Sequence, residues 1–573
     1  MVSMRQWAAL GGAAVLAAGC ESGDINLQPT TIDNSTGGGS SAPQNPCARY
    51  EEAGQTYQGE LDADGNCFYD SMFVSSTRPI RVGSITFPSF GGLHVFESSL
   101  YVGEDVNAIE AEGGQRIPQE GEGTRLTIEA GNTLVFTASD SYVRIARGSQ
   151  IFAEGTADAP ITFTADEDAV LGLATESDRG LWGGIQINGN GWTNKCDDGS
   201  PTGARGGVEP LVTGPDDPNY PGGDFAPTAN NVHNCHVTAE GRPATYGGNN
   251  NAESSGVLTY VVIKHAGYEV VDGDELNALT LNAVGSGTTI SHVQVYTTQD
   301  DGFEMFGGAV NLDHIVAVNV GDDSIDYSEG YRGNIQYAVV VQTSGSNRCI
   351  EADNTGSDRS DAGTPTTLLR ISNLTCVTSN VTMNTGTSPS SKGDAEGLLI
   401  REGAYFELYN SIVTSNETTM TSHECFELED TEGPETVDAA QAGISIARSN
   451  IVACSEPLKL GADAANADFD LAVWLAGGDG SAGTPTNGNT NNVVIDVNLP
   501  ANLLDGGVNS RGYLTLDLLT DSTGAQVFDQ AAQLTDVAPL SGYFETPTYL
   551  GGASVDDDWL EGWTVGLTEQ LVP

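Results

Sequence analysis

The sequence has little positive charge, because only 22 Lys and Arg residues stand against 78 Asp and Glu residues in a chain of 573. The resulting formal net charge of −56 repels phosphate backbones and excludes nucleic acid as a partner. After the first twenty residues the chain also lacks an apolar run long enough to cross a membrane as a helix. Glycine, by contrast, occurs 72 times, which disfavours long helices and favours short strands joined by tight turns.

Common catalytic and metal-binding motifs are missing as well. No CxxC pair is present, which argues against a structural zinc site. No GxSxG, P-loop or dinucleotide-binding fingerprint occurs in a convincing context. His265 and His292 lie in strand patterns, and we interpret both as structural residues.

The N-terminus has the pattern of an export signal. Residues 1–19 contain one Arg followed by a short apolar run, which predicts a bacterial signal peptide. The segment Leu16–Cys20 resembles a bacterial lipobox, which implies that Cys20 becomes the first mature residue and carries acyl chains such as palmitate. Glu21 rather than Asp follows it, so the resemblance implies anchoring in the outer membrane, on its periplasmic or surface side. Residues 20–46 are rich in Gly, Ser, Asn and Pro and predict a lipidated flexible tether.

Eight cysteines remain after Cys20, and an even number in an exported chain favours disulfide bonds. Their spacing suggests that neighbours along the chain pair with each other. This interpretation predicts the bridges Cys47–Cys67, Cys196–Cys235, Cys349–Cys376 and Cys425–Cys454.

Short alternating segments recur every 17 to 25 residues along much of the chain. Phe303-Glu304, Ile325-Asp326 and Ile350-Glu351 follow one another at this spacing, and Leu281-Asn282 precedes them by 22 residues. Such rungs, with Gly and Asn at the turns, predict an all-β fold, a right-handed parallel β-helix. A β-propeller is the main alternative, but it requires a repeat of roughly 40–50 residues that is not visible.

The repeat pattern also predicts the domain boundaries. We expect a signal peptide at 1–19, the tether at 20–46, an N-terminal cap at 47–120, the β-helix at 121–460 with a long loop insertion at 190–250, and a C-terminal cap at 461–573. Trp474, Trp559 and Trp563 are interpreted as the core of that C-terminal cap, because the open end of a solenoid must be covered.

Several phrases resemble a group of acidic outer-membrane lipoproteins of Gram-negative bacteria that are described only as β-helix proteins. They are ITFTA, RGLWGGIQINGNG, DDGFEMFGGAVN, GDDSIDYSEGYRG and DDDWLEGW. The resemblance covers nearly the whole mature chain and implies the fold and the location, but no activity. The wider fold resembles that of pectate lyases and polygalacturonases.

A column of carboxylates is the main candidate site. If Phe303 and its repeats point inward, Glu304, Asp326 and Glu351 point outward on one face, about 4.8 Å apart. Further acidic residues lie in the preceding turns or at equivalent positions along the column: Asp300, Asp301, Asp322, Asp323 and Glu427. Three hypotheses remain open. The column is a solvated acidic face, a Ca²⁺ site built from oxygen ligands, or a catalytic cleft that cleaves a glycosidic bond or takes a proton from a Ca²⁺-bound uronate.

For the catalytic hypothesis, Glu304, Asp326, Glu351 and Arg401 are the candidate residues, with Arg401 placed at the position equivalent to Glu351. Lys392, Arg348 and Arg401 are the candidate bases of a lyase. Asp322-Asp323 resembles a polygalacturonase doublet, but the GHG and RIK motifs of those enzymes are absent. This absence favours a protein that is not an enzyme.

We therefore expect an outer-membrane lipoprotein whose acidic β-helix binds a glycan, a matrix component or a partner protein, with Ca²⁺ as the one candidate cofactor. The first alternative is a β-helix polysaccharide lyase or glycoside hydrolase. The second is an accessory lipoprotein of a TonB-type transporter.

Overall fold

The computed structural model describes residues 45–106, 117–195, 237–242, 244–248, 250–271, 274–343, 346–354, 366–378, 397–415, 424–429, 435–454, 456–460, 469–478, 488–495, 518–520 and 526–567. All of them belong to one structural unit, Asn45–Pro573. The predicted signal peptide, most of the tether, Cys196, Cys235 and Lys392 lie outside the described residues. Within the described part, no helix is long and apolar enough to cross a membrane.

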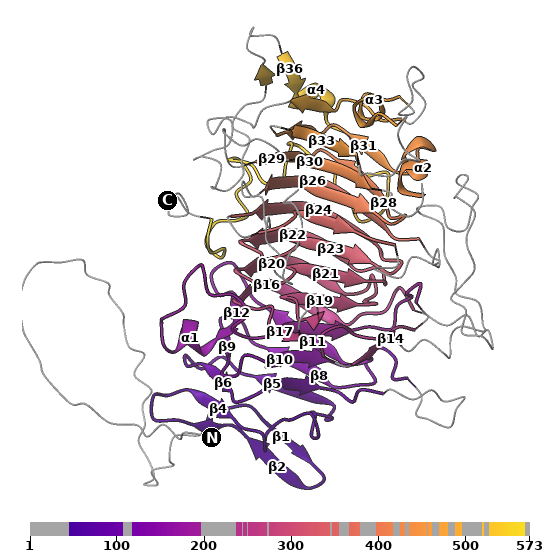
Figure 1. Ribbon diagram of the computed structural model, residues 1–573. Helices are drawn as coiled ribbons and strands as arrows, with labels where there is room; N and C mark the ends of the chain where they lie inside the picture. Colours follow the sequence, from indigo (N-terminus) through magenta and orange to yellow (C-terminus); the bar gives the residue numbers. More distant parts are fainter. Residues whose placement is uncertain are drawn as a thin grey trace, which may run out of the picture. The chain divides into compact units, whose positions relative to one another are not determined.

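One long face of the molecule is a ten-stranded sheet in which every pairing is parallel (Figure 1). Consecutive strands of this sheet are separated by the rest of a rung, so each one stacks on its predecessor from the previous turn. Its strands are β7 (Leu100–Val102), β10 (Tyr142–Ile145), β13 (Gly184–Asn188), β19 (Leu279–Asn282), β21 (Phe303–Phe306), β23 (Ile325–Ser328), β25 (Ile350–Ala352), β27 (Leu398–Arg401), β30 (Glu424–Glu429) and β33 (Glu456–Leu460).

A second sheet wraps the other two faces, because its longest strands bend in the middle and continue on the next face. The first half of β16 pairs with β11, and its second half pairs with β12. The strands of this sheet are β3 (Glu60–Leu61), β4 (Cys67–Tyr69), β5 (Ser84–Phe87), β6 (His94–Phe96), β8 (Arg125–Ile128), β9 (Thr133–Phe136), β11 (Gln150–Glu154), β12 (Ile161–Ala165), β16 (Gly256–Lys264), β20 (Thr289–Tyr296), β22 (Asn311–Val318), β24 (Arg332–Val341), β26 (Leu368–Thr378), β28 (Tyr405–Tyr409), β29 (Ile412–Ser415), β31 (Ile446–Arg448), β32 (Ile451–Ala453) and β34 (Val493–Ile495).

The remaining elements are short and lie in the loops or near the ends of the solenoid. Four separate two-stranded antiparallel sheets are present in the described chain: β1 (Arg49–Glu52) with β2 (Gln55–Gln58), β14 (Val237–Thr238) with β15 (Thr245–Tyr246), β17 (Glu269–Val271) with β18 (Asp274–Glu275), and β35 (Leu518–Thr520) with β36 (Gln526–Asp529). The helices are α1 (Asp166–Ala169), α2 (Glu435–Gln441), α3 (Leu471–Leu475) and α4 (Gln530–Gln533). This architecture confirms the predicted all-β parallel β-helix.

Alternation of apolar and polar residues places the core inside the solenoid. Phe303 and Ile325 are 0% exposed and point inward from neighbouring rungs, in the register that the 22-residue offset predicts. The predicted alignment of Leu281 with Phe303 is wrong, because Leu279 is the residue that pairs with Phe303. A slip of two residues preserves the inside-outside alternation, so hydrophobic pattern alone does not distinguish the two registers.

The long strands bend between their two halves at one residue per rung. The backbone of that residue adopts the left-handed conformation, with a positive φ angle. The column consists of Tyr260, His292, His314, Tyr337, Asn373, Asn410, Ser449 and Asn491, whose φ angles lie between 48 and 62°. Side chains other than Gly and Asn adopt this conformation at a cost. Stacking compensates here, because the ring centroids of Tyr260 and His292 are 4.4 Å apart and those of His292 and His314 are 4.5 Å apart.

The two ends of the chain cover different parts of the solenoid. At the N-terminal end, the rings of Tyr50, Tyr69 and Phe73 pack together beside the Cys47–Cys67 bridge. At the other end, the fully buried Trp474 of α3 packs against Phe406 and donates a hydrogen bond from Nε1 to the carbonyl oxygen of Ala440 at 2.7 Å. These aromatic residues close the core.

The last described segment takes a different path from the predicted end cap. Residues 534–567 return along the bend column (Figure 1). Leu560 and Trp563 of this segment pack on outward valines such as Val316 and Val339. Hydrogen bonds join Gln336 to Glu545 and Gln294 to Val565, in an order that descends the solenoid as the segment proceeds. The prediction that Trp559 and Trp563 form the core of an end cap is therefore wrong, because these residues cover an apolar lateral face that needs its own cover.

Three of the four predicted disulfides are confirmed. They are Cys47–Cys67, Cys349–Cys376 and Cys425–Cys454, with Cα–Cα distances of 5.3, 6.1 and 5.7 Å. In the last two bridges, all four cysteines are 0% exposed, so the sulfur atoms form part of the solenoid core. The predicted Cys196–Cys235 bridge falls outside the described residues.

Candidate functional site

The predicted carboxylates lie side by side on the outer face of the ten-stranded sheet. Glu304 pairs with Asp326, and Asp326 pairs with Glu351, on three consecutive rungs. The complete outward column, in order along the solenoid, is Tyr101, Arg144, Gln186, Thr280, Glu304, Asp326, Glu351, Leu399, Glu427 and Lys459. The predicted position of Arg401 is wrong, because Leu399 occupies the place next to Glu351 and Arg401 lies two residues further along β27.

The acidic column faces outward but is largely withdrawn from solvent, with Asp326 and Asp322 half-buried. Asp301, Glu304, Asp323 and Glu351 are only 3–8% exposed, and Asp300 is 7% exposed. The β14–β15 hairpin contributes to the cover, since its Tyr246 packs in a cluster with Phe306, two residues beyond Glu304. The hypothesis of a solvated acidic face is therefore wrong, because loops from other rungs remove most of these carboxylates from water.

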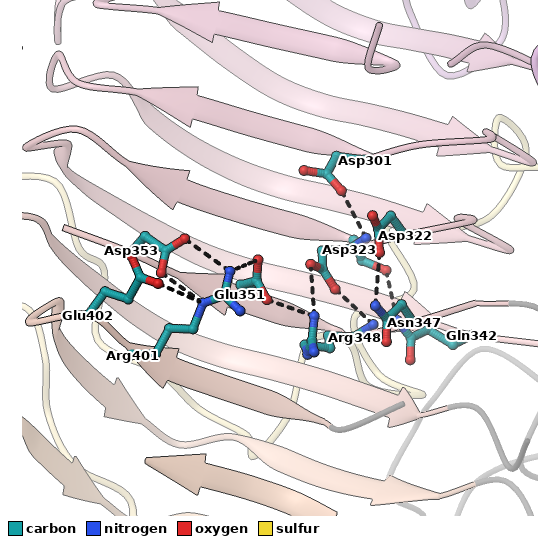
Figure 2. Close-up of polar contacts among 11 residues, drawn as sticks. Asp301, Asp322, Asp323, Gln342, Asn347, Arg348, Glu351, Asp353, Arg401 and Glu402 are labelled. Atoms are coloured by element: carbon teal, nitrogen blue, oxygen red, sulfur yellow. Dashed lines mark hydrogen bonds and ion pairs between the residues drawn. The ribbon is translucent and has the colours of Figure 1, made fainter. Parts of the chain in front are cut away.

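At one end of the column, arginines neutralise the acidic groups (Figure 2). Arg348 contacts Glu351 at 2.7 Å and Asp323 at 3.6 Å. Arg401 contacts Glu351 at 3.0 Å and Asp353 at 2.9 Å. Glu351 thus lies between two guanidinium groups, and both arginines form ion pairs with carboxylates of the fold.

At the other end, the described residues place no arginine or lysine in an ion pair with Asp301, Glu304 or Asp326. One carboxylate oxygen from each of these three residues lies within 4.8 Å of the others, and Asp300, Asp301 and Asp322 form a second such group. Asn277 donates a hydrogen bond to Glu304, and the backbone N–H of Asp323 donates to Asp301 at 2.9 Å. Asp326 Oδ1 is buried and has no hydrogen-bond partner in the described chain.

Burial and mutual repulsion raise the pKa values of this group. Desolvation is the largest cause and neighbouring carboxylates are the next, and together they hold the pKa values of Asp301, Glu304 and Asp326 well above the ordinary range. Burial also raises the pKa of Glu351 to about 7, although Arg348 and Arg401 act in the opposite direction. The unpaired end of the column therefore favours protonation or a bound cation.

Of the three candidate lyase bases, the described residues include Arg348 and Arg401, whereas Lys392 lies outside them. A lyase base must be free to accept a proton from the substrate. Arg348 is 8% exposed, and both Arg348 and Arg401 are engaged with carboxylates. Asp353 and Asn277 are important members of the network that sequence analysis missed. Asp353 could have been found by its position two residues after Glu351, on the same face of the strand.

A comparison with protein families agrees with this geometry. The family model described as a pectate-lyase-like β-helix domain matches residues 117–217 and 225–470, which is more than half of the chain. The chain belongs to this family. The pectate-lyase-like domain thus includes the outward column from Arg144 to Lys459, with Glu304, Asp326 and Glu351, and both arginines of the network. Neither the curated proteins nor the solved structures include a significant match.

Without divalent cations, the pectate-lyase-like domain should become more stable as the pH falls from about 8 to about 6.5. Below that window, burial lowers the pKa values of His94, His265 and His292, and these histidines oppose the trend. The folded protein binds protons on carboxyls with raised pKa values, whereas the unfolded chain releases them near pH 4. Stability should therefore fall as pH rises through that window, by about 1.4 kcal/mol per pH unit for each additional proton bound. Chemical denaturation in the presence of EDTA measures the free energy of unfolding at each pH.

Two variants serve as a matched pair for this measurement. Asp326→Asn removes an unpaired carboxylate, so it should raise stability near pH 8 and flatten the pH dependence. Asp353→Asn removes a partner of Arg401 and should lower stability instead. Wild-type stability that rises with pH across the same window would contradict this account.

Proposed function

We propose that this protein is an exported, lipid-anchored β-helix that binds a glycan without cleaving it and holds Ca²⁺ in its carboxylate column. Binding without cleavage is supported by the ion pairs that the described candidate bases form. Arg348 and Arg401 are ion-paired and help to neutralise Glu351. A proton-abstracting role would require one of these pairs to break and would leave a buried carboxylate uncompensated.

Glycan binding is supported by the family and by the form of the solenoid. A pectate-lyase-like β-helix presents a long lateral surface, with a repeat of about 4.8 Å along its axis, to an extended polymer. The net charge of −56 opposes the approach of an acidic polymer. A neutral glycan is therefore the favoured ligand.

Ca²⁺ fits the unpaired end of the column. The donors are carboxylate oxygens, which Ca²⁺ prefers, and three of them lie within 4.8 Å of one another. The buried Asp326 Oδ1 has no hydrogen-bond partner among the described residues, so the site includes an oxygen that a cation would satisfy. Because the surrounding carboxylates are largely buried, the ion would stabilise the fold rather than contact a polymer directly.

Anchoring rests on the sequence around Cys20, which matches the pattern of a bacterial lipobox. Outer-membrane location follows from the same pattern with Glu21 after the cysteine. Three disulfides in the solenoid are consistent with export to an oxidising compartment.

Glycan binding can be tested with the full-length Cys20→Ala protein on an array of neutral and acidic glycans, with and without Ca²⁺. We expect saturable binding to at least one polymer. The same polymer should yield neither unsaturated uronate products nor new reducing ends after prolonged incubation. Product formation would establish the lyase or hydrolase alternative, and an array without any binding would contradict the proposed function.

Ca²⁺ binding should raise the melting temperature, because the ion binds the folded chain more tightly than the unfolded one. At a Ca²⁺ concentration one hundred times Kd, the gain is about 2.7 kcal/mol. Asp326→Asn should reduce this response. Glu407→Gln should retain it, because Glu407 pairs with Arg370 on the other sheet. An equal response to NaCl at the same ionic strength would indicate screening alone and remove Ca²⁺ from the proposal.

The anchor can be tested by fractionation of cells that express the wild type or Cys20→Ala. We expect the wild type in the outer-membrane fraction and the variant in the soluble fraction, because loss of the acyl chains removes the membrane contact. Cys20→Ser should behave in the same way. Membrane retention of both variants would contradict lipid anchoring at this cysteine.

A further inference from the structure

A second cluster of potential metal ligands lies on the bend column, away from the carboxylates of the ten-stranded sheet. His292 and His314 occupy equivalent positions in β20 and β22, with φ angles of 54 and 50°. Their rings stack with centroids 4.5 Å apart and planes inclined by 6°. Parallel register and the left-handed backbone therefore hold two imidazoles side by side on adjacent rungs.

The polar edges of these rings converge on Asp313. His314 Nδ1 lies 2.8 Å from Asp313 Oδ1, and His292 Nδ1 lies 2.8 Å from Ser291 Oγ. Ser291 Oγ in turn donates to the same Asp313 oxygen at 2.5 Å. One ligand atom from each of His292, Asp313 and His314 lies within 4.8 Å of the other two. A short chain of hydrogen bonds thus brings two ring nitrogens and a carboxylate to one place.

We propose that His292, Asp313 and His314 bind a divalent transition metal ion, with Zn²⁺ as the representative case. Two imidazole nitrogens and one carboxylate are the ligand types of zinc, copper and nickel sites, whereas Ca²⁺ requires more oxygen ligands. In-plane lone pairs of parallel rings do not meet at one point. Binding therefore turns the rings out of their stack and replaces the hydrogen bonds at their Nδ1 atoms with metal bonds.

Two of the three proposed ligands are partly open to solvent. The side chains of Asp313 and His314 are 33% and 23% exposed, so water or another ligand can complete the coordination sphere. Tyr543 Oη lies 3.5 Å from Asp313 Oδ2, and the ring of Trp559 packs edge-on against His314 with centroids 4.9 Å apart. The site therefore lies where the returning C-terminal segment meets the solenoid, and the ion would link two rungs next to that contact.

This site differs from the carboxylate column in both place and chemistry. The column lies on the ten-stranded sheet and offers oxygen ligands only, whereas the histidine site lies on the bend of the other sheet. The two sites therefore predict separate responses, to Ca²⁺ in one case and to Zn²⁺ in the other. Failure of one proposal leaves the other intact.

The test uses full-length Cys20→Ala protein freed of metal with a chelator, and isothermal titration with Zn²⁺. We expect one equivalent of Zn²⁺ to bind, and His292→Gln and His314→Gln each to weaken binding at least tenfold. Asp313→Asn should also weaken it. The matched control is the double variant His233→Gln/His236→Gln, because these two histidines flank Cys235 in the sequence and could bind zinc independently. That control should retain the wild-type affinity.

Cu²⁺ gives a second readout that does not depend on affinity. Its electron paramagnetic resonance spectrum should show coupling to two nitrogens in the wild type and to one in His314→Gln. Cooperative thermal unfolding without added metal should persist in His314→Gln, which verifies that this variant is folded. The proposal is overturned if the wild type takes up no stoichiometric Zn²⁺, or if His292→Gln and His314→Gln bind it as the wild type does.

Discussion

The whole structure depends on one constraint, which is that equivalent strands of successive rungs stack in register about 4.8 Å apart. It gives continuous parallel sheets, and it also forces like side chains into contact along each column. Two carboxylates at that spacing repel by roughly 3–4 kcal/mol at an effective dielectric constant of about 20. Glu304, Asp326 and Glu351 are arranged in this way, so the molecule must neutralise a repulsion that its own repeat creates.

The column is neutralised differently at its two ends. Near Glu351, guanidinium groups from Arg348 and Arg401 provide fixed counter-charges. Near Glu304, burial without a described cationic side chain raises the carboxyl pKa values and creates a place for protons or a metal ion. One structural column therefore combines a permanent ion-pair network with a site whose charge depends on its surroundings.

The sequence predicted the parts of the fold that follow from period and alternation. The 22-residue offset located Glu304 opposite Asp326, and proximity along the chain identified three disulfides. Sequence analysis failed where two strand registers have the same alternation of apolar and polar residues. A slip of two residues keeps the same face inward, which explains the errors for Leu281 and Arg401. Burial of the acids and stacking of His292 on His314 depend on loops and bends that periodicity does not describe.

The return of the C-terminal segment along the bend column has a consequence for biogenesis. Val565 bonds to Gln294, a residue 271 positions earlier, and Trp563 covers valines of the central rungs. A chain synthesised from its N-terminus completes those rungs long before their cover emerges. During that interval the central bend exposes an apolar strip, so safe maturation of this protein depends on how quickly its last residues arrive or on a chaperone that shields the strip until they do.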